Sequence, residues 1–521
     1  IDRGDIASGA TSKSSRLIHG GLRYLEYGDL RLVREALAER ERLLRLAPQF
    51  VRPLRFYVPV HGRVSGCLAA LLRLLGISPR RPTRRGLWIV RAGLWLYDRF
   101  TKASSLPRRS IHRSTEPDVP SVDAETFRWL CAYSDAQMLY PERYTLALLT
   151  DCQELAKERQ VDFRVFTYHD VSLSNGVATL TDQLDATGAL TVRPAVIINA
   201  TGAWGDATLN TLAVSTPKLL AGNQGSHFVT ANLDLRGALS NGSVYCETGD
   251  GRFVFILPFD ERVLIGTTEV EFDGDPHDAT ASGAELDYLI GLVNSVFPNV
   301  SLARSDVLCH YSGVRPLPNT KAPSASAVSR DHSIHAAQHG ATVVLTLVGG
   351  KLTTSRLLAE QTADMVLRRI GRSRKASTRN RIVPGGESFP PDEASSRQAL
   401  DSLVARSGIT HDAAKAIWQL CGMRVHDVIA ILSNDSSDCV ADTVLPIGFV
   451  RWLIQHEWVR TLEDLVERRL LLLPAHDCSA ATLRELAELL VEAGVCAREQ
   501  MEDEIAKCRR HLETAFGYRI E

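Results

Sequence analysis

The first 26 residues carry the side chains best suited to bind a phosphate or ribose group. Asp2 follows an apolar residue, and a small, hydroxyl-rich segment, SGATSKSS, occupies residues 8–15. Small residues let the backbone approach a bulky ligand closely, and hydroxyls beside exposed N–H groups suit phosphate and ribose oxygens. Many segments of this composition are solvated loops. Here the apolar and basic run RLIHGGLRY follows at residues 16–24, which favours a ligand-binding loop.

Two later segments place similar residues after an apolar run. Residues 195–199 end at Ala200-Thr201-Gly202, which predicts a buried parallel strand whose carboxyl end meets a ligand. Residues 342–348 lead into GGKLTT at 349–354 and then into a predicted helix, whose first N–H groups would face an anion or a polarised carbonyl. Asp2 and these segments together suit a dinucleotide fold.

One part of such a fold does not occur in the sequence. A dinucleotide-binding domain places a glycine-rich turn before the acidic residue that holds the ribose, and no such turn precedes Asp2. We therefore expect a chain that begins within the motif, as an N-terminally truncated form. A truncated chain of this kind would bind the dinucleotide poorly.

Composition excludes several classes of protein. A chain of 521 residues is too long for one hydrophobic core, so two or three domains are expected. The net charge of −1 excludes a globally basic nucleic-acid binder. The ten cysteines form no C-x-x-C and no metal-like spacing, which favours a reducing compartment and predicts no metal site. No apolar run is long enough for a transmembrane helix.

The periodicity of apolar residues predicts the elements that position these loops. Helices are expected from an N-cap at Asp29 to about Leu46 and over residues 138–159. A short strand is expected at 161–166, a meander through 177–180 and 190–192, and antiparallel strands within 224–312. A shift to Arg, Ser, Gly and Pro at 372–390 marks a domain boundary. Helices are then expected at 412–419, 462–472 and 480–512.

Residues 42–97 contain eleven arginines and no aspartate or glutamate. Four of these arginines, Arg80, Arg81, Arg84 and Arg85, form a cluster, and Trp88, Trp95 and Tyr97 follow this cluster. Arginine beside interfacial aromatic residues is typical of a segment that lies on an anionic membrane surface. Two core-packing helices joined by a solvated basic loop would have a similar composition, and the sequence leaves this alternative open.

Longer motifs carry a family resemblance. In chain order they are ATSKSSRLIHGGLRYLE, LVREALAERERLLRLAPQ, INATGAW, GSHFV, IGTTEVEFDGDP, YSGVRPL, SRDHSI, GGKLTT and HEWVRTLEDLVERR. The chain resembles the FAD-dependent, membrane-associated glycerol-3-phosphate dehydrogenases over nearly its whole length. The resemblance implies an α/β fold, with a Rossmann-like FAD-binding domain, an interleaved antiparallel-sheet substrate domain and an all-helical C-terminal domain.

The resemblance also implies how the domains divide the chain. The FAD-dependent oxidoreductase region would span residues 1–375, and the C-terminal helical domain would span 385–521. Flavin-binding parts are expected at about 1–50, 140–205 and 335–375. Substrate-binding parts are expected at about 51–139 and 206–334.

The implied reaction oxidises glycerol 3-phosphate to dihydroxyacetone phosphate, with FAD accepting a hydride. The resemblance implies His227 as the base and Arg315 as the group that holds the developing oxyanion or carbonyl oxygen. It implies a substrate site formed by Arg23, Tyr24, Thr268, Arg330 and Lys351. The cofactor residues it implies are Asp2, Ser12, Ser14, Ser15, Leu17, Val171, Thr201, Gly202, Gly350, Leu352 and Thr353.

The resemblance further implies a membrane quinone as the electron acceptor and a homodimer. With the arginine-rich segment 42–97 as an anchor, the protein is expected on the cytoplasmic face of a membrane as a peripheral protein. Two alternatives stay open from the sequence. One is an oxygen-dependent glycerol-3-phosphate oxidase, and the other is a flavin-deficient, non-enzymatic fragment that serves as a binding module.

Overall fold

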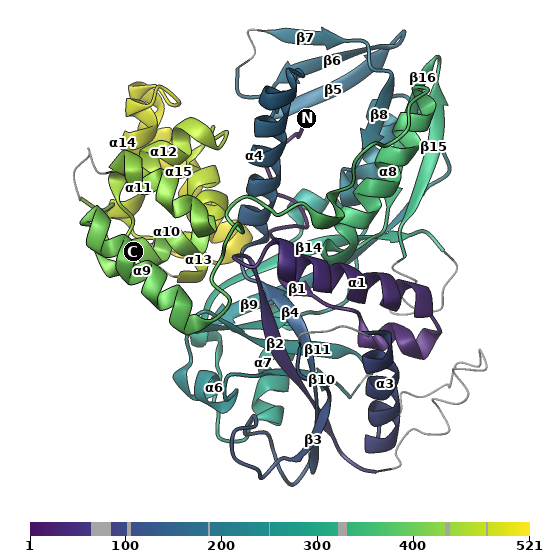
Figure 1. The fold of residues 1–521 in the computed structure, drawn as a ribbon, viewed down its shortest axis with the longest axis vertical. Coiled ribbons are helices and arrows are strands. Elements are labelled where there is room, and N and C mark those ends of the chain that lie inside the picture. The colour runs from purple at the N-terminus through teal and green to yellow at the C-terminus, as the bar shows by residue number, and fades with distance from the viewer. Residues whose placement is uncertain are drawn as a thin grey trace.

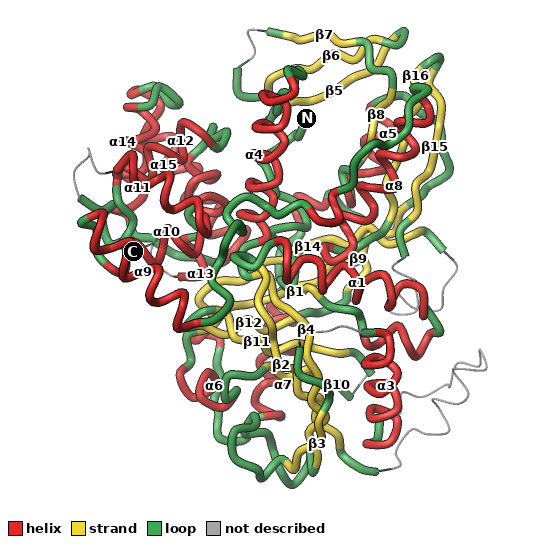
Figure 2. Tube along the Cα trace, in the orientation of Figure 1, coloured by secondary structure: helices red, strands yellow, loops and turns green. Residues whose placement is uncertain are grey.

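The fold has three parts that surround the N-terminal segment (Figure 1). We describe it from a computed structural model, which covers residues 1–63, 85–101, 106–185, 188–249, 251–320, 331–432, 438–475 and 478–520. A large sheet fills the lower part of the view, two small sheets fill the upper part, and the C-terminal helices pack at one side. Figure 2 shows the same separation of strands and helices.

The large sheet has ten strands, in the order β1-β4-β2-β10-β11-β12-β9-β13, with β14 also paired to β9 and β3 to β4. Most of its pairs are antiparallel, and β2 with β10 is a parallel pair. Its strands are β1 (Leu17–Ile18), β2 (Val51–Val60), β3 (Ser110–Arg113), β4 (Trp129–Met138), β9 (Leu220–Thr230), β10 (Ser243–Glu247), β11 (Phe253–Phe259), β12 (Arg262–Gly266), β13 (Val270–Glu271) and β14 (Val307–Pro318).

Helices cover both faces of this sheet. On one face, α6 (Leu233–Ala238) and α7 (Gly283–Val296) pack their apolar residues on Phe228, Ile256 and Ile265. On the other face, α1 (Leu30–Leu46) and α3 (Leu87–Phe100) share a core with the sheet and with the C-terminal helices. Residues that alternate along β9 therefore face two different environments.

Two three-stranded sheets form the upper part. One contains β5 (His169–Ser174), β6 (Val177–Asp182) and β7 (Ala189–Val192), all antiparallel. The other has the order β15 (Ser333–His339), β16 (Thr342–Val348) and β8 (Val196–Asn199), with β8 parallel to β16. Because β8 and β16 run in parallel, their carboxyl ends lie at the same edge of the sheet. Helices α4 (Pro141–Arg159), α5 (Gly205–Thr211) and α8 (Ser355–Arg369) belong to this part.

The C-terminal part is helical. It contains α9 (Glu393–Ser407), α10 (His411–Cys421), α11 (Val425–Leu432), α12 (Ile447–His456), a π-helical segment at Asp464–Arg469, α13 (Leu472–Ala475), α14 (Ala480–Glu492) and α15 (Met501–Phe516). Of the helices within the described ranges, none is both long and apolar enough to cross a membrane.

Several expected elements are confirmed. Helix α1 begins after Asp29 and ends at Leu46, and the hairpin of β11 and β12 turns at Asp260-Glu261, because Phe259 pairs with Arg262. The parallel strand before Thr201 and the strand before Gly349 are both present. The fold class, mixed α/β with a helical C-terminal region, is confirmed as well.

Other expectations were wrong. The helix expected from Met138 begins at Pro141, since Met138 pairs with Val51 as the last residue of β4. Residues 161–166 form no strand, and Val161 is 63% exposed. The strand at 196–199 is parallel but not fully buried, because β8 is an edge strand and Ile198 is 48% exposed.

Two further corrections concern the helical part and the arginine-rich segment. The helix expected over 480–512 is divided into α14 and α15, because Gly494 adopts φ +71° between them. Arg85, expected in a membrane-facing cluster, is buried and pairs with Glu247 at 2.5 Å. Arg80, Arg81 and Arg84 lie outside the described residues.

A buried ion cluster joins the N-terminal loop to the helical part. Asp5 is 1% exposed and accepts hydrogen bonds from Arg468 Nε at 2.5 Å and from Arg469 Nη1 and Nη2 at 2.7 and 2.8 Å. The two guanidiniums lower the pKa of Asp5, although burial alone would raise it. Arg468 also pairs with Asp464 and Glu467. The carboxylate therefore stays ionised and links positions more than 460 residues apart in sequence.

We expect Asp5→Asn to destabilise the protein, because removing one partner of a buried pair leaves the other charges uncompensated, at a cost of about 3–5 kcal/mol. Thermal unfolding followed by circular dichroism should show a melting temperature several degrees lower. The control is Asp162→Asn, which removes an exposed ion pair with Arg164. Equal melting temperatures for the two variants would contradict the role given to Asp5.

Candidate active site

Strands β9 and β14 form the floor of the candidate site. They pair antiparallel, and directly opposite residues of such a pair have side chains on the same face. One face of this ribbon, opposite to α7, carries three consecutive cross-strand pairs: His227–Tyr311, Gly225–Gly313 and Asn223–Arg315. The face thus carries no side chain at the glycine pair, and it has a histidine on one side of the pair and an arginine on the other.

The glycine at position 225 allows the Arg315 guanidinium to lie across the strand. Arg315 Nη1 donates to Asn223 Oδ1 at 2.6 Å, and Nη2 donates to Thr267 Oγ1 at 2.7 Å. A Cβ atom added to Gly225 would overlap Nη2 and the guanidinium carbon of Arg315. Without a side chain there, the guanidinium extends over β9 toward His227.

His227 is buried and electrically neutral. The side chain is 3% exposed, its Nε2 lies 2.8 Å from Ser15 Oγ, and its ring stacks on Tyr311 with centroids 5.0 Å apart. Within the described part of the chain, Nδ1 has no hydrogen-bond partner. Burial, together with the nearby Arg315 and Arg16, lowers the pKa of His227 to about 3. At neutral pH the ring is therefore unprotonated.

The hydroxyl-rich N-terminal loop closes over this floor. Tyr311 donates its hydroxyl to the Ser14 carbonyl at 2.9 Å, and a Cβ added to Gly313 would lie 2.8 Å from Lys13 Cβ. Ser12 is buried and donates to the Gly9 carbonyl. Ser15 reaches His227, so the structure brings this predicted cofactor residue to the predicted base.

The loop is held by a buried arginine. Arg16 pairs with Glu142 of α4, with Nη2 at 2.7 Å from Oε1, and donates to the Leu139 carbonyl at 2.6 Å. The Arg16 N–H donates to Ser14 Oγ at 3.2 Å. Leu17 follows in β1, where it is buried and pairs with Gln137. The Ser14 side chain is therefore turned toward its own backbone.

Arg23, Tyr24 and Lys351 form a second cluster beside the floor. Lys351 Nζ lies 4.3 Å from the centroid of the Tyr24 ring. Arg23 Nη1 lies 3.6 Å from Glu269 Oε1, two residues after Thr267, which holds Arg315. The structure thus brings Lys351 to Tyr24, and it brings Arg23 to the turn after β12. Arg330 lies outside the described residues.

Thr268 differs from the other predicted substrate residues in its contacts. It is 2% exposed, and its Oγ1 donates to Glu285 Oε1 at 2.6 Å and accepts from the Ser226 N–H at 2.9 Å. Its hydroxyl therefore faces α7. Its neighbour Thr267 is the residue whose hydroxyl contacts Arg315.

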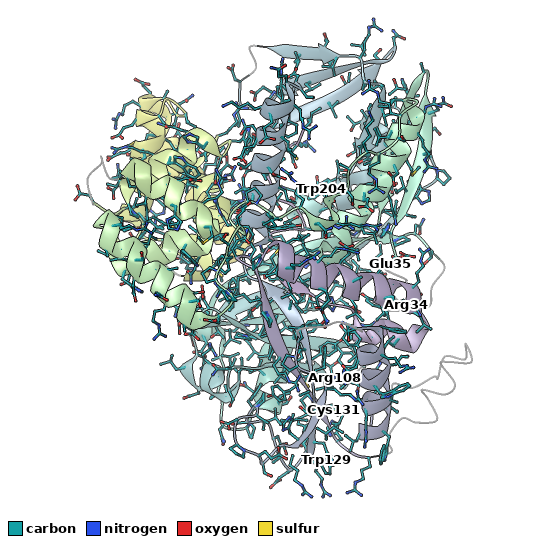
Figure 3. The ribbon with its side chains drawn as sticks, viewed as in Figure 1. Arg34, Glu35, Arg108, Trp129, Cys131 and Trp204 are labelled. Atoms are coloured by element: carbon teal, nitrogen blue, oxygen red, sulfur yellow. The ribbon has the colours of Figure 1, made fainter. Side chains whose placement is uncertain are left out.

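The predicted cofactor residues Thr201, Gly202, Gly350, Leu352 and Thr353 lie at the carboxyl ends of β8 and β16. Thr201 and Gly202 follow β8, and Gly350 adopts φ +91° after β16. The His19 N–H donates to Thr353 Oγ1 at 3.2 Å, which ties the N-terminal segment to the start of α8. Trp204, labelled in Figure 3, donates its Nε1–H to Asp275 and lies against Gly9.

Asp2 and Val171 lie together at the other side of this region. The Asp2 N–H donates to the Phe166 carbonyl at 2.8 Å, and the Asp2 carbonyl accepts from the His169 N–H at 2.9 Å. His169 begins β5, in which Val171 is the third residue. The acidic residue predicted for the ribose is therefore fixed beside β5 by its backbone.

These residues fit a large ligand with phosphate and carbonyl oxygens. Helix α8 has 15 residues, and its N-cap, Thr354, makes no side-chain capping hydrogen bond. Gly202 has φ +59° and open space within 4 Å of an added Cβ. Backbone N–H groups at a helix start and side-chain-free turns are groups that anions and flat rings contact. The loops after β8 and β16 thus fit the flavin that the sequence predicts.

Sequence reasoning missed four residues that shape this site: Asn223, Thr267, Glu285 and Tyr311. The antiparallel pairing of β9 with β14 places Asn223 and Tyr311 on the same face as His227. Alternate residues of a strand face the same side, so the sequence NQGSHF would have placed Asn223 on the same face as His227. The distant partners on β14 and α7 could not be found from local pattern.

Comparisons with known proteins identify the family. A model of the FAD dependent oxidoreductase family matches residues 1–356. The chain is 30% identical, over 98% of its length and 91% of the relative's, to a glycerol-3-phosphate dehydrogenase from Synechocystis sp.. It is 31% identical, over 90% of its length and 88% of the relative's, to a D-erythritol 1-phosphate dehydrogenase from Brucella abortus.

A solved structure shares the fold. The structure of a glycerol-3-phosphate dehydrogenase from Bacillus halodurans complexed with FAD matches 99% of this chain and 89% of its own, with a TM-score of 0.70 at 21% identity. The order and packing of the elements described above are therefore those of a known flavoprotein fold.

The low pKa of His227 predicts a pH dependence of stability. Because the folded pKa of about 3 lies below the ordinary 6.5, the unfolded chain binds the proton first. The stabilisation is complete above pH 6.5 and is lost as the pH falls toward 3. Between pH 7 and 5 the loss from this residue is about 2 kcal/mol.

Urea unfolding of wild-type protein and His227→Gln at pH 7 and 5 tests this. The variant should lose about 2 kcal/mol less stability than wild type over this interval. The other titrating groups are shared by both proteins, so the difference isolates His227. An identical loss in both proteins would contradict a buried neutral histidine.

Proposed function

The chain belongs to the FAD dependent oxidoreductase family, and on this premise we propose that it oxidises sn-glycerol 3-phosphate to dihydroxyacetone phosphate. The observation that carries the proposal is that the neutral His227 and the Arg315 guanidinium lie on the same face of β9 and β14, on either side of the glycine pair Gly225–Gly313. Relatives named for oxidation of polyol phosphates support the substrate class.

Bound FAD supplies the acceptor for the hydride that leaves C2 of the substrate. His227 takes the proton of the C2 hydroxyl, because its ring is unprotonated at neutral pH and its Nδ1 makes no hydrogen bond to the described residues. Arg315 stabilises the oxygen as it becomes a carbonyl, because two of its N–H groups are already fixed by Asn223 and Thr267.

The substrate phosphate would be held by the cations beside the floor. Lys351 lies over the ring of Tyr24, Arg23 is the neighbour of Tyr24 in sequence, and Arg330 belongs to the same proposed set. Arginine suits phosphate because its planar fork donates two parallel hydrogen bonds. We assign Thr268 to the same set, with its backbone beside Arg315.

The cofactor residues would act through the loops that the fold brings together. Asp2 would hold the adenosine ribose and Val171 the adenine. The loop with Ser12, Ser14, Ser15 and Leu17 would contact the pyrophosphate and the ring system. The turns after β8 and β16 would close over it, through Thr201, Gly202, Gly350, Leu352 and Thr353.

Turnover of the purified protein with sn-glycerol 3-phosphate tests the function. We expect reduction of a quinone analogue to be much faster than oxygen consumption, because the proposed acceptor is a membrane quinone. Faster oxygen consumption would instead support an oxidase.

His227→Ala should lower turnover by about 100-fold at unchanged flavin content, as loss of a general base does. Unchanged turnover would remove His227 from the mechanism.

A second substrate deserves comparison, because the Brucella abortus relative is named for D-erythritol 1-phosphate. The two substrates share the phosphate and the secondary alcohol and differ in chain length. The ratio of the kcat/KM values for the two substrates, measured at a saturating concentration of the electron acceptor, shows which substrate the enzyme prefers. A higher value for D-erythritol 1-phosphate would replace glycerol 3-phosphate within the same reaction class.

We also propose that α3 binds an anionic membrane surface. Trp88 and Trp95 are 51% and 52% exposed on one face of the helix, while Leu87, Val90, Leu94 and Tyr97 are buried on the other. The guanidinium carbon of Arg91 lies 5.3 Å from the centroid of the Trp88 ring, and that of Arg99 lies 5.9 Å from the centroid of the Trp95 ring. Tryptophan beside arginine is the composition of membrane-interface helices.

Replacing both tryptophans, Trp88→Ala with Trp95→Ala, should weaken binding to phosphatidylglycerol-containing vesicles by roughly 10-fold or more, since both rings leave the interface. Vesicle sedimentation at low salt measures the binding. The matched control is Leu233→Ala, which removes an apolar side chain that is 80% exposed on α6. Equal binding by the double variant and wild type would contradict the membrane role of α3.

A further inference from the structure

Glu285 is a buried carboxylate behind the candidate site. It is the third residue of α7 and the acidic member of a capping box with Ser282. Its side chain is nearly fully buried, and Oε2 accepts from the Ser282 N–H at 3.0 Å and from the Ser282 hydroxyl at 2.9 Å. A capping residue of this kind is usually exposed to solvent, so its burial against the sheet calls for a second role.

The second oxygen of Glu285 contacts the strands that carry the site. Oε1 accepts from Ser226 Oγ at 2.7 Å and from Thr268 Oγ1 at 2.6 Å, and Oε2 accepts from Gln224 Nε2 at 3.2 Å. Ser312 of β14 extends the network through a 2.8 Å contact with Ser226 Oγ. All these hydrogen bonds are made on the α7 side of the sheet.

The network lies directly behind His227 and Arg315. Ser226 precedes His227 in β9, and its side chain points to the opposite face of the strand. Glu285 therefore lies on the other side of the sheet from His227 and Arg315, the residues proposed to act on the substrate. Its influence on the reacting groups has to pass through the two strands.

One connection leads to Arg315. The Thr268 hydroxyl donates to Glu285 and accepts from the Ser226 N–H, so both of its hydrogen-bonding directions are fixed. Thr267 Oγ1 holds Arg315 Nη2 at 2.7 Å, and the Thr268 carbonyl lies 3.5 Å from the same nitrogen. The position of Thr268 thus determines where the guanidinium lies over Gly225.

We propose that Glu285 is a positioning residue for the oxidation, acting through Thr268 and Ser226 on Arg315 and His227. The inference rests on the proposed function for its kinetic consequences and on the hydrogen bonds alone for its structural ones. A carboxylate can accept from every partner named above at once. An amide would either place its N–H group against the N–H groups of Ser282 and Gln224, or make the Ser226 and Thr268 hydroxyls turn from donating to accepting.

The experiment compares E285Q with wild type in steady-state turnover of sn-glycerol 3-phosphate with a dye acceptor. We expect kcat to fall about 10-fold or more while KM changes by less than about threefold, because a displaced guanidinium weakens stabilisation of the reacting oxygen. Flavin content should be unchanged. The matched control is D287N, two residues along α7, which removes only an exposed ion pair with Arg304.

A double-variant cycle separates positioning from a loss of folding. If Glu285 acts through the Thr267–Arg315 contact, T267V combined with E285Q should lower kcat by clearly less than the product of the two single effects. If kcat of the double variant falls by the full product of the two single effects, the proposal is overturned. It is also overturned if E285Q and D287N have equal kcat values.

Hydrogen–deuterium exchange without substrate gives a readout that does not depend on the reaction. The Ser226 N–H donates to Thr268 Oγ1, so peptides covering residues 224–230 should exchange about 10-fold faster in E285Q and unchanged in D287N. If wild type does not oxidise glycerol 3-phosphate, the proposed function fails while this measurement still decides the role of Glu285. Unchanged exchange in E285Q would overturn it.

Discussion

The structure depends on one buried carboxylate near the start of the chain. Asp5 lies between Arg468 and Arg469, and the exposed fraction of the Asp5 and Arg469 side chains is 0%. Around it, Arg143 pairs with Glu457, and Tyr168 donates to Asp464 at 2.6 Å. Buried pairs of this kind add little net stability compared with apolar packing, but an unpaired member is costly. The cluster therefore selects one arrangement of the helical part against the N-terminal loop.

This arrangement matters for the site because the same loop reaches the sheet. Seven residues after Asp5 the chain enters the segment from Ser12 to Ser15. The last residue of this segment, Ser15, contacts His227 Nε2 through its hydroxyl. Lys13 Nζ lies 3.6 Å from the Phe516 ring centroid at the end of α15. The loop is thus fixed from the helical side and packs on the face of β9 and β14 that carries His227. The C-terminal part helps to form the site although it contributes no residue to the floor.

Local pattern was enough to predict many of the elements, but not how distant segments meet. Helix α1, the β11–β12 hairpin and the turns after β8 and β16 follow from periodicity and turn residues, which are short-range properties. His227 was identified through its motif. Its stacking on Tyr311 and the support from Glu285 arise from the pairing of strands about 80 residues apart, which one sequence does not encode locally. Arg85 was misplaced because composition cannot distinguish an exposed arginine from one that pairs with a distant Glu247.

The charge distribution around His227 connects the architecture to the chemistry. Arg16 holds the loop, and Glu142 balances its charge. The neutral side chains of Asn223 and Thr267 each accept a hydrogen bond from the Arg315 guanidinium. Arg315 and Arg16 add to burial in lowering the pKa of His227, because nearby cations favour the neutral form of the ring. Under the proposed function, a carboxylate in place of Asn223 would offset the charge of Arg315 and weaken its attraction for a developing oxyanion. Asn223 and Thr267 thus fix the guanidinium on the face that carries His227, while Glu285 fixes Thr268 from the other face of the sheet.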